Sequence, residues 1–204
     1  VRPGCQGGPV TSNVSSRLPV PMPSPSPFPP DAVIADTVRW LERAVIGLNL
    51  CPFAKAVHTK GQIHYVVSEA TDASDLLQEL RHELQALAEI SAEKRDTTLL
   101  IAPRCLQDFL DFNDFLGLTE DLVDTLDLDG VLQVASFHPQ FQFADAAQDD
   151  ITNATNRAPY PILHLLREDS IDRDDFLVVC DEKGDETTSK GLADFLSQHQ
   201  RVGT

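Results

Sequence analysis

The chain has 204 residues, 42% of them hydrophobic and 24% charged, a balance typical of one globular domain with a hydrophobic core. Its formal net charge is −16, because 32 Asp and Glu residues outnumber 16 Lys and Arg residues. This charge argues against nucleic-acid binding, which needs a basic face toward the phosphates, and no Lys/Arg cluster occurs.

Membrane and secretory signals are not found in the sequence. No apolar run approaches the roughly 18 residues that span a bilayer, and no basic segment precedes an apolar one near residue 1. We therefore expect a soluble, cytoplasmic protein without a membrane partner. The four cysteines lie far apart and form no CxxC pair, which predicts reduced thiols.

The two ends of the chain differ in composition from its middle. Residues 1–30 are rich in Pro and Ser, which predicts a disordered tail. Met22 is the single methionine, so we expect translation to start there, and a transit-peptide remnant is the alternative. Residues 174–204 form a divergent segment, with an edge strand expected at 176–180 and a short helix at 191–199.

The first half of the predicted domain, residues 31–173, begins with an amphipathic helix. Apolar residues recur at helical spacing from residue 34 to 48, Asp31 can cap the start, and Pro52 marks the stop. Cys51 then lies just past a helix C-terminus in extended backbone, because proline follows it. Strands are predicted at 63–68 and 97–101, with a leucine-rich helix between them that Thr71 or Ser74 caps.

The second half adds helices at 106–116 and 119–128 and strands at 131–135 and 162–166. Strands that alternate with helices predict a single α/β domain with a mixed, partly parallel sheet of about four strands flanked by helices. His138 and Pro139 follow the carboxyl end of the third strand, where open α/β sheets tend to bind ligands.

Three residues are candidates for catalysis. His138, at a strand end, could be a general base, a metal ligand or a hydrogen-bonded turn residue. His164 lies in the apolar run PILHLLRE, where burial favours the neutral ring, and could be a satisfied core histidine. Cys51 could be a nucleophile, although a position after a helix C-terminus favours a small buried hydrophobe instead.

The densest set of hydrogen-bonding groups lies in one loop. These candidate ligand-binding residues are Asn153, Thr155, Asn156, Arg157 and Tyr160. The planar guanidinium of Arg157 suits a carboxylate or a phosphate, which favours recognition of a small anion. The alternative is a structural loop in which Arg157 pairs with Asp149 or Asp150.

Common nucleotide, protease and lipase motifs do not occur: there is no GxGxxG, GxxxxGK[ST], HExxH or GxSxG. The sequence thus identifies no cofactor. Asp108, Asp111 and Asp114 lie three apart beside a phenylalanine stripe, which predicts a solvated acidic helix face rather than a cation site.

Five segments resemble a bacterial family catalogued as domain of unknown function 1415. They are GLNLCPFAKAV (47–57), DTTLLI (96–101), DFNDFL (111–116), VLQVASFHPQFQF (131–143) and NATNRAPYPILHLLRE (153–168). The resemblance covers roughly residues 37–173, and from Asp174 onward the sequence departs from the family pattern. It implies that the family motifs contain Cys51, His138, Asn153, Asn156, Arg157 and His164, and it implies no activity.

Three functional hypotheses follow. In the first, the Asn/Arg loop binds a small anionic metabolite and His138 and His164 supply acid/base chemistry. In the second, His138, His164 and either Cys51 or His64 bind zinc or iron. In the third, the motif residues only hold the loop of an interaction module without enzymatic activity.

Overall fold

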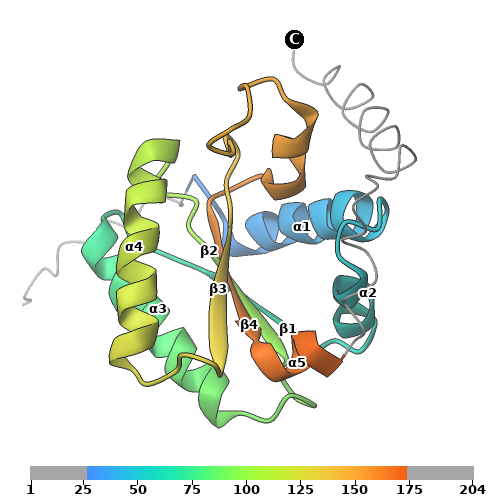
Figure 1. The fold of residues 1–204 in the computed structure, drawn as a ribbon, viewed down its shortest axis with the longest axis vertical. Coiled ribbons are helices and arrows are strands. Elements are labelled where there is room, and N and C mark those ends of the chain that lie inside the picture. The colour runs from blue at the N-terminus through green and yellow to red at the C-terminus, as the bar shows by residue number, and fades with distance from the viewer. Residues whose placement is uncertain (1–26, 174–204) are drawn as a thin grey trace, which may run out of the picture.

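The computed structural model describes residues 27–173 and shows one α/β domain around a four-stranded sheet (Figure 1). The strands are β1 (Ile63–Val67), β2 (Thr97–Ile101), β3 (Leu132–Phe137) and β4 (Ile162–Arg167), in the order β1-β2-β4-β3. β1 and β2 are parallel, whereas β4 runs antiparallel to both β2 and β3. The predicted mixed, partly parallel sheet is therefore confirmed.

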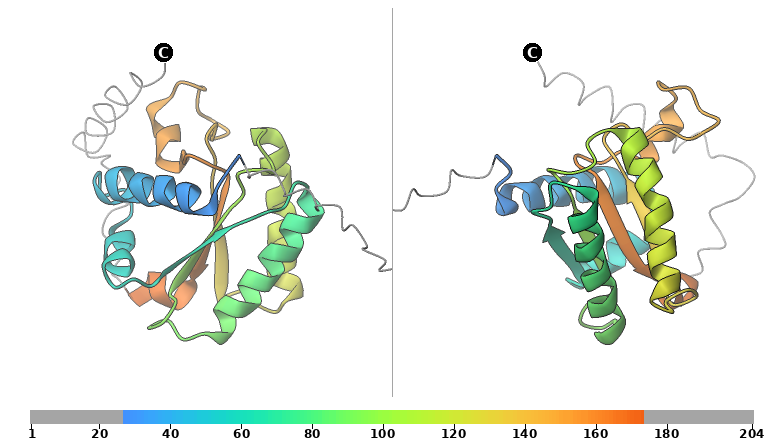
Figure 2. Two further views of the ribbon diagram at one scale, coloured as in Figure 1. Left: turned by 180° about the vertical axis from the view of Figure 1, so that it is seen from behind. Right: turned by 90° about the vertical axis from the view of Figure 1, so that its left-hand side faces the viewer.

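Two long helices cover one face of the sheet (Figure 2). α3 (Ala73–Glu89) buries Leu76, Leu80, Leu84 and Leu87 completely, because these leucines recur every three or four residues. Its start is capped by Asp72, whose side chain accepts a hydrogen bond from the Asp75 amide, and not by Thr71 or Ser74. This helix crosses between β1 and β2, and so allows them to be parallel.

The second helix on this face, α4 (Phe109–Thr125), replaces the two helices predicted at 106–116 and 119–128. Gly117 lies inside this single helix and is exposed. An interior glycine costs a helix about 1 kcal/mol. The burial of Phe112, Phe115 and Leu122 against the sheet outweighs that cost, since each such side chain contributes about 2 kcal/mol. Asp108 caps this helix, and Asp111 and Asp114 are exposed, as the acidic-face interpretation expects.

The opposite face is covered by α1 (Pro30–Trp40), the π-helix η1 (Leu41–Ile46) and α2 (Pro52–Thr59). The amphipathic helix predicted from residue 31 is present, but its last turn widens into the π-helix. The sequence reading missed α2, because Pro52 was interpreted as a stop. Proline also suits the first position of a helix, where no amide hydrogen bond is lost, and Pro52 occupies that position.

The connection from β3 to β4 is a long loop beyond the end of the sheet, drawn in orange in Figures 1 and 2. It contains the 3₁₀ helix η2 (Ile151–Asn156), and the described chain ends with α5 (Glu168–Arg173) after β4. The predicted edge strand at 176–180 and helix at 191–199 lie outside the described residues, as does the tail up to residue 26. No helix between residues 27 and 173 is long and apolar enough to cross a membrane.

Candidate functional site

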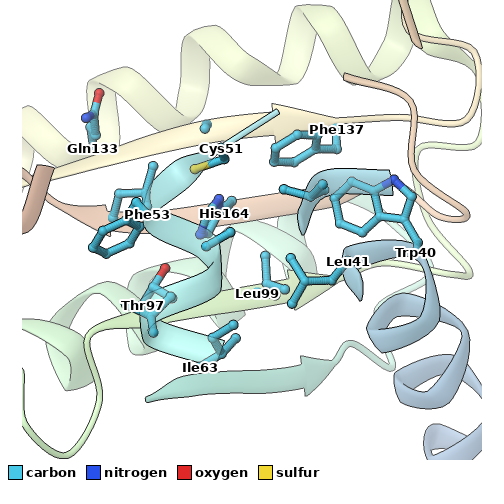
Figure 3. Close-up of a pocket in the computed structure, with 15 residues that line it drawn as sticks. Trp40, Leu41, Cys51, Phe53, Ile63, Thr97, Leu99, Gln133, Phe137 and His164 are labelled. Atoms are coloured by element: carbon cyan, nitrogen blue, oxygen red, sulfur yellow. The ribbon is translucent and has the colours of Figure 1, made fainter. Parts of the chain in front are cut away.

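A cavity of about 280 Å³ lies between the sheet and the layer formed by η1 and α2 (Figure 3). Its walls are almost entirely apolar, and among residues 27–173 none of those that line it carries a charge. The aromatic walls are Trp40, Phe53 and Phe137, and the aliphatic walls are Leu41, Val45, Ala54, Val57, Ile63, Leu99, Ala135 and Leu166. Its polar residues are Cys51, Thr97, Gln133 and His164.

His164 lies in the middle of the sheet wall, because β4 pairs it with Leu99 of β2 and Ala135 of β3. Its ring is 6.0 Å from that of Phe137 and partly exposed within the cavity, and no side chain or backbone group of residues 27–173 bonds either ring nitrogen. Burial lowers its pKa to about 4, so that the ring is neutral at physiological pH. A neutral imidazole offers one N–H donor and one acceptor, and here both remain available to a bound molecule.

Cys51 enters the cavity from the helical wall, opposite the sheet (Figure 3). The sequence reading placed it after a helix C-terminus, but it is also the N-cap residue of α2, with the expected extended backbone (φ −140°, ψ 104°). Burial raises the pKa of its thiol, and the amides of Ala54 and Phe53 at the helix start offset this only in part. The group is therefore a protonated thiol rather than a thiolate.

The remaining polar side chains of the cavity differ in availability. The Thr97 hydroxyl donates to the Leu165 carbonyl oxygen at 2.6 Å, so its hydrogen is already used within the sheet. Gln133 lies on edge strand β3 and is exposed. His164, by contrast, lies in the middle of the sheet wall, and neither of its ring nitrogens is bonded within residues 27–173.

His138 lies on the other face of the sheet, against α4, and is completely buried. Its ring packs between those of Phe109 and Phe112, at centroid distances of 5.4 and 5.1 Å. Nε2 donates to the Leu106 carbonyl oxygen at 3.2 Å, and Nδ1 accepts from the Gln140 amide at 3.0 Å. Burial also lowers the pKa of this ring. Nδ1 therefore holds the turn that follows β3, and Nε2 ties this turn to the loop before α4, as the structural alternative for this residue expects.

The amide side chains of the loop are bonded to its own backbone. Asn153 is fully buried, where Oδ1 accepts from the Phe143 amide at 2.9 Å and Nδ2 donates to the Ala147 carbonyl oxygen at 2.7 Å. Asn156 donates to the Ser136 carbonyl oxygen at 3.3 Å. These contacts fold the loop back onto the end of β3.

Three further loop side chains also have intramolecular partners. The Thr155 hydroxyl donates to the Thr152 carbonyl oxygen at 2.8 Å. Tyr160 points away from the loop, and its hydroxyl donates to Asp36 of α1 at 3.0 Å. Arg157 donates from Nε to the Phe141 carbonyl oxygen and from Nη2 to the Gln148 carbonyl oxygen.

Arg157 also lines a polar surface hollow of about 540 Å³, together with Gln140, Gln148, Asp149 and Asp150. The expected structural pairing with either aspartate is not found among the described residues; the guanidinium bonds carbonyl oxygens instead. The backbone of Arg157 contacts a wall of the apolar cavity, because its carbonyl oxygen accepts a hydrogen bond from Nε1 of Trp40 at 2.9 Å.

Of the sequence candidates, only Cys51 and His164 share one cavity. His138 lies across the sheet from them, and His64 faces α3, 4.0 Å from Glu83. Within residues 27–173, no three His, Cys, Asp or Glu side chains are grouped as a metal site would require. The sequence reading missed the aromatic walls, although Gln133, Ala135 and Phe137 alternate along one strand face as cavity-lining residues would.

Comparison with known proteins gives a family and no relative of known function. Searches of curated proteins and of solved structures found no match. A family model described as protein of unknown function (DUF1415) matches residues 32–176, which is most of the chain and includes both walls of the cavity. The chain belongs to the DUF1415 family.

Proposed function

We propose that this protein binds a small, largely apolar molecule with one polar group in the cavity between η1, α2 and the sheet. The observation that carries the proposal is His164, a neutral ring without a hydrogen-bond partner inside otherwise apolar walls. The ring is partly exposed within the cavity, and a ligand that bonds it gains the net contribution of one hydrogen bond, about 0.5–1.5 kcal/mol.

The size of the cavity sets the size of the molecule. An apolar protein cavity of roughly 150 Å³ accepts benzene, so 280 Å³ corresponds to about ten to twelve non-hydrogen atoms. The walls are also held in place before a ligand arrives. Trp40 is fixed by its bond to the Arg157 carbonyl oxygen and by the Phe137 ring, 5.2 Å from its own. Such preorganised aromatic walls favour a planar, bicyclic ligand.

Trp40 is the single tryptophan of the chain, so its fluorescence reports on this cavity. We expect 2-naphthol to change the Trp40 emission saturably. Ala135→Leu fills the cavity from the sheet wall and should abolish the saturable change. Ala88→Leu, the same substitution on the exposed side of α3, is the matched control and should leave it unchanged. Equal responses of the two variants would refute binding in the cavity.

A second candidate is recognition of a small anion at the Arg157 hollow. It is favoured by one observation: the guanidinium has no carboxylate partner among the described residues, and two backbone carbonyl oxygens hold it in place. The amides of Asn153 and Asn156 contribute less than expected, because they are bonded to the backbone. Inorganic phosphate should raise the melting temperature of the wild type and of Arg157→Lys, but not of Arg157→Gln. A shift that is equal in all three proteins would refute the site.

Acid/base chemistry by His138 together with His164 finds no support in this geometry, because the two rings lie on opposite faces of the sheet. Any proton transfer in the cavity would have to involve His164 with Cys51 or with the ligand itself. The Cys51 thiol has a raised pKa and the His164 ring a lowered one, so transfer between them is unfavourable. The proposed function is therefore binding, not a reaction.

A further inference from the structure

The polar group of the ligand can be specified from the charges around the cavity. No Asp, Glu, Lys or Arg side chain lines it from η1, α2 or any of the four strands. Its titratable groups are His164 from β4 and Cys51 from the start of α2. Nothing in these walls can neutralise an ionised ligand, and an unpaired charge is far more costly to bury than a neutral hydroxyl.

The backbone around His164 offers no substitute for a charged partner. β4 is hydrogen-bonded on both sides, to β2 and to β3, so its amides and carbonyl oxygens are used within the sheet. At Thr97, the hydroxyl hydrogen is directed to the Leu165 carbonyl oxygen. A carboxylate at His164 would therefore meet only neutral donors among the lining residues: the ring itself, the Cys51 thiol and the Gln133 amide.

An un-ionised hydroxyl matches the same position. It can donate to the unprotonated nitrogen of His164, and its attached aromatic ring can contact Phe137 and Trp40, which lie along the same side of the cavity (Figure 3). An aromatic N–H, as in indole, would donate in the same way. The hydroxyl and the acceptor nitrogen of the ring are then both satisfied without moving a proton.

Given the proposed function, we infer that the cavity selects an aromatic molecule that carries one un-ionised hydrogen-bond donor, such as a phenolic hydroxyl, and rejects the carboxylate of the same ring. The inference specifies the ligand class for the cavity and depends on binding there. It also implies that an aromatic carboxylic acid enters only with a proton, so that its affinity rises as the pH falls toward the pKa of the acid.

The test compares three probes that share one ring system: 2-naphthol, naphthalene and 2-naphthoate. Binding is measured by equilibrium dialysis at about pH 7.5, where the naphthol is neutral and the naphthoate is ionised. For the wild type we expect naphthol to bind about three- to tenfold more tightly than naphthalene, the effect of one net hydrogen bond. Naphthoate should bind at least about tenfold more weakly than naphthalene, because its charge is not compensated.

The matched variant is His164→Leu, which removes the acceptor while the apolar walls stay. Naphthalene binding by this variant reports an intact cavity, and the preference for naphthol over naphthalene should disappear. The inference is overturned if naphthoate binds the wild type as tightly as naphthol, or if the naphthol preference survives in His164→Leu. Absence of saturable naphthalene binding in the wild type would instead overturn the proposed function itself.

Discussion

The pH dependence of stability tests directly whether burial keeps His164 neutral. In the unfolded chain this histidine takes up a proton near its ordinary pKa of 6.5, whereas in the folded protein burial lowers the pKa to about 4. Above pH 6.5 both states are neutral and the free energy of unfolding is unaffected. Between pH 6.5 and 4 only the unfolded state binds the proton, so the free energy of unfolding decreases as the pH is lowered.

The magnitude follows from the two pKa values. Their difference corresponds to about 3 kcal/mol once the pH is below 4, and to about 2 kcal/mol at about pH 5. His164→Leu abolishes this contribution. We therefore expect the loss of stability between about pH 7.5 and 5 to be about 2 kcal/mol smaller in the variant than in the wild type. At about pH 7.5 the two proteins should differ by less than about 1 kcal/mol, since leucine leaves no hydrogen bond broken.

Urea unfolding at the two pH values, followed by Trp40 fluorescence, measures these differences. His138 has a lowered pKa for the same reason, but it is present in both proteins and cancels in the comparison. His82→Gln is the control, because it removes an exposed histidine of α3 without changing the cavity, and it should keep the wild-type difference. If His164→Leu also keeps the wild-type difference, burial does not hold this ring neutral and the reasoning on the cavity fails.

Further predictions concern four residues on the two faces of the sheet. Gly47→Ala should cost roughly 1–3 kcal/mol of unfolding free energy, because a Cβ at the end of the π-helix would collide with the Arg43 carbonyl oxygen. Gly117→Ala, in open space on α4, should instead stabilise by about 0.5–1 kcal/mol, and urea unfolding that ranks the two the other way would contradict this geometry. His138→Leu should cost about 1–3 kcal/mol at neutral pH, since it leaves two partly buried backbone groups without their partner, and a loss below about 0.5 kcal/mol would refute that role. Cys51 should react with N-ethylmaleimide more slowly than a free thiol at about pH 7.5, faster as the pH rises, and more slowly again with 2-naphthol present; peptide mass mapping that shows rapid, ligand-independent labelling would contradict its burial in the cavity.

The local elements of this fold could be predicted because they depend on neighbours in the sequence. The run TTLLI is short and apolar, and it forms β2 with all five residues buried. Four leucines of α3 repeat at helical spacing and are completely buried against the sheet. Helix boundaries were predicted wrongly where two local preferences competed. Pro52 was interpreted as a stop but begins α2. Two helices were predicted where the single helix α4 tolerates Gly117 in its interior, because packing of the helix outweighs the low helix propensity of glycine.

The candidate site, by contrast, was decided by tertiary structure. The sequence by itself determined that His138 follows a strand and that His164 lies within one. Because side chains alternate between the faces of a sheet, strand pairing and helix placement put His138 against α4 and His164 in the cavity with Cys51. Likewise, the sequence shows that Arg157 offers a guanidinium in a polar loop, but it does not show that carbonyl oxygens are the partners of this group. Which groups remain unpaired depends on contacts between residues far apart in the chain, and those contacts make His164 the available polar group and His138 a structural one.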